Sequence, residues 1–253
     1  MDAGMFDKAF TKRLERLTLL ARRLYARRLE RAPRRKATAG EFEDRREYVP
    51  GDDVTTLDWT LYGRLERLYV RRYRQRDTIE VHLLVDASRS MASRDGRKHR
   101  VALRIAAALA HLALHHGDRV RLASFREGID RELRPLRGRR QLGTVLHFLE
   151  QLEPDGGTDL AETIRQLLVR ARRGGRAVVL GDLWHWDPDD RSFALLEAAD
   201  VDPLAVQVLG REDRIAPEEG PVRLVDRETS QTREGTLDAA ARRRYTEAVA
   251  ART

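Results

Sequence analysis

A regular alternation of strand-like and helix-like segments occupies the chain from Ile79 to Leu209. Short apolar runs such as Val178-Val179-Leu180 have the composition of buried strands, and the longer segments between them carry apolar residues at helical spacing. Parallel strands need long crossover connections, which helices usually supply. The alternation therefore predicts an α/β fold with a doubly wound, mostly parallel sheet that helices cover on both faces.

The pattern also predicts the individual elements of this sheet and of the segment that follows it. The expected strands are 79–85, 119–125, 177–180, 203–209 and 222–225, and the expected helices are 98–116, 141–152, 159–173, 192–199 and 239–251. In the first of these helices, Val101, Ile105, Leu109 and Leu112 lie on one face, which we expect to pack on the sheet.

The basic residues are concentrated at the start of the chain. Residues 1–36 hold twelve Lys or Arg against four acidic residues, which accounts for the whole net charge of +8. Apolar residues recur every three or four positions from Phe6 to Leu24, so this segment is predicted to be a basic amphipathic helix docked on its own protein. The alternative is that its basic face binds an anionic membrane surface, an acidic partner or nucleic acid.

Residues 37–78 have a different character. From Leu68 to Tyr73 apolar and polar residues alternate with a period of two, which is typical of a strand. We expect this part to be an appended β-rich segment of strands and turns. The chain is thus predicted to comprise a basic helix (1–36), this β-rich segment (37–78), the α/β domain (79–226) and a C-terminal helical extension (227–253).

The absence of cysteine narrows the chemistry that the chain can perform. Disulfides, thiolate metal sites and cysteine nucleophiles are all excluded. The longest charge-free apolar stretch, from Ile105 to Gly117, is too short to cross a bilayer. A charged N-terminus is unlike a signal peptide, so we expect a cytoplasmic location, free or at the surface of the inner membrane.

Oxygen-bearing side chains follow the predicted strands at the edge where such sheets bind ligands. Asp86, Ser88 and Ser90 follow the first strand, Thr158 follows a Gly-Gly pair at a helix start, and Asp182 follows the strand at 177–180. Each of them alone is typical of a helix cap or a loop. Together they form a set of hard oxygen ligands, which suits Mg²⁺ or Mn²⁺ better than zinc.

Two parts of the sequence resemble known families. The order Asp86-x-Ser88-x-Ser90, then Thr158, then Asp182 is similar to the metal-ion-dependent adhesion site of von Willebrand factor A domains, and this similarity extends from Ile79 to about Leu209. Upstream, a second block resembles the bacterial domain-of-unknown-function family 58 (DUF58), whose members are typically found with MoxR-type AAA+ ATPases. That block consists of Glu41-Phe42-Glu43-Asp44-Arg45-Arg46-Glu47-Tyr48-Val49-Pro50-Gly51-Asp52-Asp53, then Leu57-Asp58-Trp59, Tyr62, Arg64 and Leu65.

The resemblance implies a von Willebrand A/Rossmann-like fold and a role for each residue of the site. The serine and threonine hydroxyls would bind the metal directly, while Asp86 and Asp182 would act mainly through bound water; whether Thr158 binds directly is open. The cation would then accept an acidic oxygen from a protein partner. The implied function is a non-catalytic, Mg²⁺-dependent adaptor that acts with a MoxR-type ATPase or with its client.

Catalysis is the alternative function of the same residues. Asp86 and Asp182 would then hold Mg²⁺ in a hydrolase, but the only histidine near the three loops is His185, and neither a nucleophile elbow nor a phosphate loop is present.

We also expect four residues around the metal site to form a rim that contacts the partner. Their types are enriched in interfaces, and they are Arg89, Met91, Trp184 and Trp186. The alternative is that at least one of the tryptophans packs beneath the sheet edge.

Overall fold

The computed structural model describes residues 5–29, 41–74, 78–93, 95–170, 175–184, 191–216, 218–229 and 231–252; the side chains at 19–29, 41–44, 71–74 and 252 are not described. The chain divides into two compact units. The larger unit consists of Met1–Ala21 and Ile79–Thr253, and the smaller unit is Arg22–Thr78.

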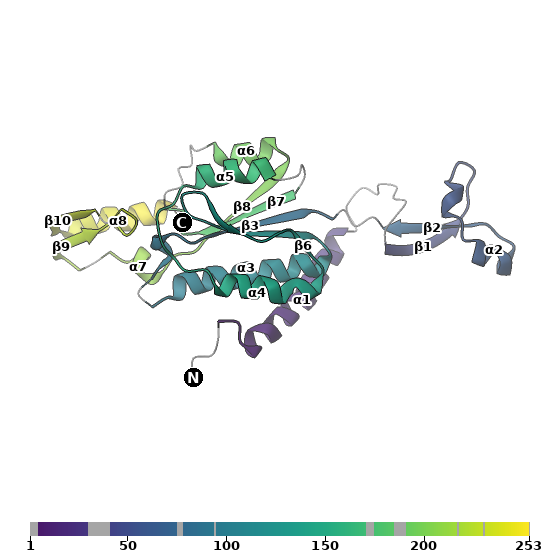
Figure 1. Ribbon diagram of the computed structural model, residues 1–253, viewed down its shortest axis with the longest axis horizontal. Helices are drawn as coiled ribbons and strands as arrows, with labels where there is room; N and C mark the ends of the chain where they lie inside the picture. Colours follow the sequence, from purple (N-terminus) through teal and green to yellow (C-terminus); the bar gives the residue numbers. More distant parts are fainter. Residues whose placement is uncertain are drawn as a thin grey trace. The chain divides into compact units, whose positions relative to one another are not determined.

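A mostly parallel sheet forms the centre of the larger unit (Figure 1). Its parallel strands, in spatial order, are β4 (Arg119–Phe125), β3 (Glu80–Asp86), β7 (Gly175–Gly181) and β8 (Val201–Gln207). Two short strands, β5 (Ile129–Glu132) and β6 (Leu136–Arg137), pair with β4 in antiparallel orientation. The predicted α/β class with a mostly parallel sheet is therefore confirmed. The two edge strands were not predicted, because they carry few apolar residues and depend on pairing with β4.

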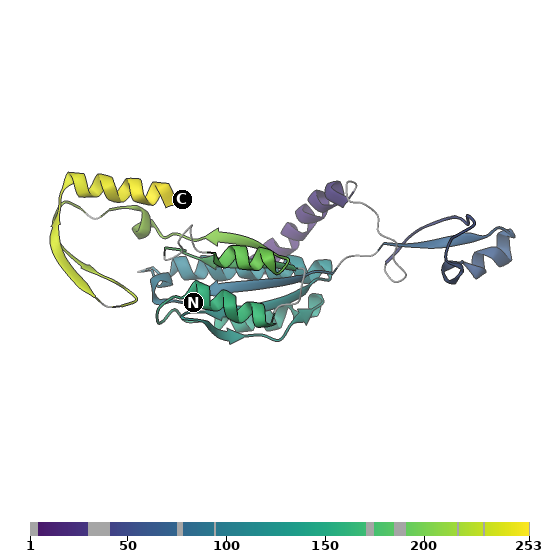
Figure 2. The same ribbon diagram turned by 90° about the horizontal axis from the view of Figure 1, so that it is seen from above.

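Helices cover both faces of this sheet (Figures 1 and 2). One face bears α3 (Arg97–His116) and α4 (Leu142–Glu150), which follows the 3-10 turn η3 (Arg139–Gln141); the other bears α5 (Leu160–Arg170) and α6 (Ser192–Ala198). Side chains alternate between these faces along each strand. In β3, for example, Leu83 packs in the core under α3 and α4, and Leu84 packs in the core under α5 and α6.

The buried face of α3 differs from the predicted one. Val101 is 45% exposed, whereas Ala102, Ala106 and Ala110 are completely buried. Alanine side chains leave room for the helix axis to lie close to the sheet, so the larger Ile105 is only partly buried, beside the core. The contact face also includes Leu103 and Leu114, so the prediction placed it too far round the helix.

The first half of α1 (Lys8–Leu29) docks on the larger unit with part of its predicted apolar stripe, whereas Leu17 of that stripe is 37% exposed. Asp7 caps the helix, since its Oδ1 accepts a hydrogen bond from the N–H of Phe10 at 2.7 Å. Leu14 is only 2% exposed, and Thr18 Oγ1 lies 2.7 Å from His111 Nε2 of α3. Leu24, the last residue of the predicted stripe, lies outside the described side chains.

The smaller unit contains a hairpin of β1 (Glu41–Glu47) and β2 (Tyr69–Arg74), with the 3-10 turn η1 (Val54–Thr56) and helix α2 (Trp59–Leu65) between its strands. Helix α2 corrects the prediction of strands and turns alone. It has only seven residues, and Asp58 stabilises its start by accepting a hydrogen bond from the N–H of Leu61 at 3.2 Å. Asp58 is itself buried, and its Oδ2 lies 2.8 Å from Arg45 Nε.

The C-terminal part of the larger unit contains α7 (Arg211–Arg214), an antiparallel hairpin of β9 (Gly220–Val225) and β10 (Thr232–Leu237), and α8 (Ala239–Arg252) (Figure 2). Strand β10 was not predicted because it is largely exposed and has no alternation of apolar residues. The predicted domain limit at residue 226 falls in the turn of this hairpin. Within the described ranges, no helix is both long enough and apolar enough to cross a membrane.

Candidate metal site

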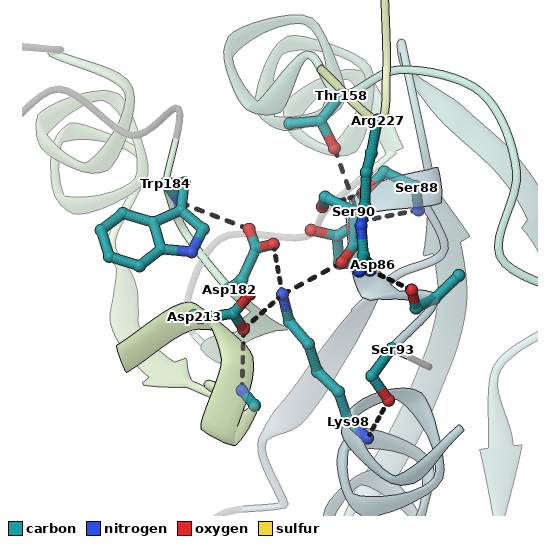
Figure 3. A network of polar contacts seen from close by, with 12 residues as sticks. Asp86, Ser88, Ser90, Ser93, Lys98, Thr158, Asp182, Trp184, Asp213 and Arg227 are labelled. Carbon is teal, nitrogen blue, oxygen red and sulfur yellow. Dashed lines mark hydrogen bonds and ion pairs between the residues drawn. The ribbon is translucent and has the colours of Figure 1, made fainter. Parts of the chain in front are cut away.

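Two buried carboxylates mark the site at the carboxyl ends of neighbouring parallel strands (Figure 3). Asp86 is the last residue of β3 and Asp182 directly follows β7, and each is only 2% exposed. Because β3 and β7 pair in parallel register, with Val85 opposite Leu180, their ends lie side by side. The fold therefore brings together residues that are almost one hundred positions apart.

Three hydroxyl groups gather around Asp86. Its Oδ1 accepts hydrogen bonds from the N–H of Ser88 at 2.8 Å and from Thr158 Oγ1 at 3.4 Å. Ser88 Oγ lies 2.9 Å from Ser90 Oγ. The structure thus links four of the five predicted ligands through hydrogen bonds around Asp86.

Backbone hydrogen bonds hold the two loops of the site against each other. The N–H of Arg89 donates to the carbonyl oxygen of Gly156 at 2.9 Å, and the N–H of Asp155 donates to that of Ala87 at 2.8 Å. The loop after β3 and the Gly-Gly loop before α5 therefore form one unit, which is why Thr158 reaches Asp86.

Asp182, the fifth predicted ligand, is held by an ammonium group. Lys98 Nζ lies 2.8 Å from Asp182 Oδ2 and 2.8 Å from Asp213 Oδ2, and it donates to the carbonyl oxygen of Ser90 at 3.0 Å (Figure 3). The Lys98 side chain is only 1% exposed. The sequence contains no local signal for this buried cation, because a lysine near a helix start is ordinarily exposed.

Burial and neighbouring charges change the acidity of Asp86. Burial, the largest cause, raises the pKa of Asp86 to about 6. Hydrogen bonds from Ser88 oppose this shift, and the nearby carboxylates of Asp182 and Glu228 add to it. A bound cation would favour the ionised form of this carboxyl group.

Glu228 belongs to the site although it was not predicted. It lies in the turn between β9 and β10, and its Oε2 accepts a hydrogen bond from the N–H of Thr158 at 3.1 Å. The C-terminal segment showed only a short strand and a helix in its sequence pattern. Nothing in that pattern indicated that an exposed hairpin folds back to the sheet.

Gly181 is a further unpredicted requirement of the site. A Cβ atom at Gly181 would lie 2.7 Å from Asp86 Oδ2 and 2.8 Å from Asp86 Cβ. Such contacts are too short for a real side chain, so any larger residue would displace Asp86. Glycine is therefore needed at the end of β7 for Asp86 to occupy its observed position.

The predicted partner rim is only partly exposed. Arg89 is on the surface, where its Nη2 lies 2.6 Å from Asp155 Oδ1, and Trp184 is half-buried. The prediction for Met91 is wrong: the 3-10 turn η2 (Arg89–Met91) directs its side chain inward, where it is fully buried against α3 and Val208. Trp186 and His185 lie outside the described residues.

The donor set suits a hard cation. In the described part of the chain, no three His, Cys, Asp or Glu side chains gather so as to hold a metal ion. A metal at this site would therefore depend on the hydroxyls of Ser88, Ser90 and Thr158 together with Asp86. Oxygen ligands of this kind, with few direct carboxylates, fit Mg²⁺ with several retained waters.

The fold and the site define an α/β protein with a cluster of carboxylates and hydroxyls at the carboxyl end of its parallel sheet. The chain belongs to the DUF58 family of proteins of unknown function, whose family model matches residues 44–253. This confirms the family that the residues between Glu41 and Leu65 indicated.

Related proteins share a substantial part of this chain. Uncharacterized protein Rv1480 of Mycobacterium tuberculosis and uncharacterized protein Mb1516 of Mycobacterium bovis are each 33% identical to it over 212 residues. These matches cover 81% of this chain and 66% of the relatives, so the chain spans just under two thirds of their length.

Among solved structures, the conserved hypothetical protein BatB from Bacteroides thetaiotaomicron is 17% identical with a TM-score of 0.43, and the match covers 67% of this chain and 85% of BatB. An aerotolerance-related membrane protein from Bacteroides fragilis is 18% identical with the same TM-score, and the match covers 67% of this chain and 87% of that one.

Proposed function

We propose that this protein is a non-catalytic adaptor that binds an acidic residue of a protein partner through Mg²⁺ or Mn²⁺. The larger unit would be a von Willebrand factor A-like domain, and the cluster around Asp86 its metal-ion-dependent adhesion site. One observation carries the proposal: the predicted ligands Asp86, Ser88, Ser90 and Thr158, from two distant segments, meet within hydrogen-bond distance at one edge of the sheet.

Each residue of the site has a defined part in this function. The hydroxyls of Ser88, Ser90 and Thr158 would hold the cation, and Asp86 and Asp182 would orient its bound water. When bound, the cation supplies an electrophilic position for a carboxylate oxygen of the partner. The hydrogen bonds that Asp86 accepts already orient its carboxylate toward the serine loop.

Lys98 supports this arrangement through its ion pair with Asp182. Its ammonium group fixes Asp182 and balances part of the negative charge, so that fewer uncompensated carboxylates face the cation. A cation with little direct negative charge retains a strong preference for an added carboxylate. The site is thereby suited to recognition.

A MoxR-type AAA+ ATPase, or the client of such an ATPase, is the partner that we propose. The DUF58 family and the resemblance of the block between Glu41 and Leu65 support this choice. We place the protein in the cytoplasm, where Arg89 and Trp184 would contribute to the surface that the partner contacts. The proposal includes no specific nucleic acid.

Mg²⁺ titration of the whole chain tests the proposal. Calorimetry of the wild type should give saturable Mg²⁺ binding, and the variant S88A combined with D86A should bind at least about tenfold more weakly. The matched control is D202A, because Asp202 is a carboxylate at the opposite end of the sheet, where it pairs with Arg176 on the surface.

Binding to a MoxR-type ATPase from the same genome is then measured with Mg²⁺ and with EDTA. We expect binding that requires the metal and that is lost in the double variant but retained in D202A. Equal binding with and without metal would refute the proposal. The single variant S88A, which keeps the backbone hydrogen bond to Asp86, provides a second test if the double variant does not fold.

A further inference from the structure

The turn between β9 and β10 places an acidic side chain against the proposed ligands. Glu228 Oε2 accepts a hydrogen bond from the N–H of Thr158 at 3.1 Å, and its Oε1 is shielded from solvent. The carboxylate also lies beside the neighbouring Gly157, where a Cβ atom would be at ordinary contact distance, 3.8 Å, from Glu228 Oε2. A carboxylate from a distant segment therefore lies against the loop that carries Thr158, one of the proposed ligands.

The turn itself is shaped by a local carboxylate. Asp226 Oδ1 accepts hydrogen bonds from the N–H groups of Glu228 at 2.9 Å and Thr229 at 2.8 Å. The N–H of Asp226 also donates to the carbonyl oxygen of Gln231 at 2.8 Å, which closes the turn. These bonds fix the direction in which the side chain of Glu228 leaves the backbone.

Arg227 links the same turn to the loop that follows β3. Arg227 Nη1 donates to the carbonyl oxygen of Ala92, and Arg227 Nη2 lies 3.2 Å from Glu212 Oε1. Figure 3 labels Arg227 among the residues of this network. The hairpin is thus attached to both loops of the site, through Arg227 to one and through Glu228 to the other.

The carboxylate of Glu228 acts electrostatically on Asp86, since its negative charge is one of the causes that raise the pKa of Asp86. Like charges repel each other, so each of these two carboxylates disfavours the ionised form of the other. A divalent cation held by the serine and threonine hydroxyls would convert this repulsion into attraction. The position of Glu228 beside Thr158 is therefore suited to a role toward a cation.

We propose that Glu228 is the chain's own acidic ligand for this site. It supplies within one molecule the carboxylate that a partner would otherwise supply, so the β9–β10 hairpin regulates access of the partner to the metal. This inference rests on the proposed function. An acidic partner must displace Glu228, and loss of Glu228 must leave the site open to other carboxylates.

The test compares the wild type with E228A, E228Q and a control in the same hairpin, E234A. Glu234 is a suitable control because its side chain is 78% exposed in β10. Mg²⁺ affinity is measured by calorimetry with and without added acetate, which serves as the carboxylate probe. Hydrogen exchange of the Thr158 amide is followed by NMR in the absence of metal. The exchange rate reports whether Glu228 accepts the hydrogen bond from this amide.

We expect E228A to bind Mg²⁺ at least about tenfold more weakly than the wild type, and acetate to restore much of this loss in E228A only. The Thr158 amide should exchange faster in E228A than in the wild type. In E228Q the amide oxygen can still accept the hydrogen bond from Thr158, so protection should persist while Mg²⁺ affinity falls. The control E234A should match the wild type in both measurements.

The outcomes separate this inference from the proposed function. If the wild type and E228A bind Mg²⁺ equally and acetate has no effect, Glu228 is not a ligand, although the metal-dependent function stands. Unchanged exchange of the Thr158 amide in E228A would also overturn the inference. If the folded wild type binds no Mg²⁺ at all, the proposed function fails and the inference fails with it.

Discussion

The buried ammonium group of Lys98 provides the sharpest test of the charge arrangement in the site. We consider the variant K98M, which retains a long apolar side chain but removes the charge. The wild-type ammonium is 1% exposed and lies 2.8 Å from both Asp182 and Asp213. Because Asp182 is itself 2% exposed, the variant leaves a buried carboxylate without its cation, and such a change typically costs about 3–5 kcal/mol.

A double-mutant cycle in urea tests this magnitude. The variant D182N neutralises the partner, so K98M combined with D182N should be less destabilised than the sum of the single variants, by about 1–3 kcal/mol. Far-UV circular dichroism of the whole chain follows unfolding, and K12M serves as the control because Lys12 is an exposed lysine of α1. A loss below about 1 kcal/mol in K98M, or strict additivity in the cycle, would refute the reasoning.

Three further predictions concern the core and the site. His82 is fully buried and burial lowers its pKa, so unfolding takes up a proton below about pH 6.5. The contribution of His82 to stability should therefore fall from pH 7 to pH 5, whereas the raised pKa of Asp86 acts in the opposite direction. In urea titrations, H82L should lose less stability than the wild type over this pH range. The variant G181A should displace Asp86 and weaken Mg²⁺ binding, whereas G143A, with open space around its Cβ, should bind normally in calorimetry. The variant L14A should lose about 2–5 kcal/mol in denaturant unfolding, because Leu14 is 2% exposed where α1 docks; a loss near zero would contradict that docking.

The parts of the fold that were predictable are those with strong local patterns. Strands β3 and β7 contain short apolar runs that are buried on both faces, and β4 has apolar residues at Val120, Leu122, Ala123 and Phe125. Strands β5, β6 and β10 carry few apolar residues, so only pairing with a neighbour makes them strands. Helix α2 depends similarly on one capping carboxylate, that of Asp58.

The candidate site divides in the same way. Asp86 and Asp182 could be located because a residue at the end of a parallel strand must lie at one edge of the sheet, whatever the details of packing. Met91 was misplaced because a 3-10 turn rotates its side chain away from the surface. The spacing of apolar residues in the sequence gives no indication of such a turn. Lys98 was missed because a lysine at the start of a helix ordinarily faces solvent.

The observed contacts divide the site into two halves of different charge. In one half, the ammonium of Lys98 already balances Asp182 and Asp213. In the other, the contacts described for Asp86 come from the amide of Ser88 and the hydroxyl of Thr158, and none comes from an ammonium or guanidinium group. An added cation would therefore gain most on the side of Asp86. The three hydroxyls lie on that side, and the hairpin brings Glu228 to the same side. The half of the site that can hold a metal is therefore also the half that Glu228 can cover.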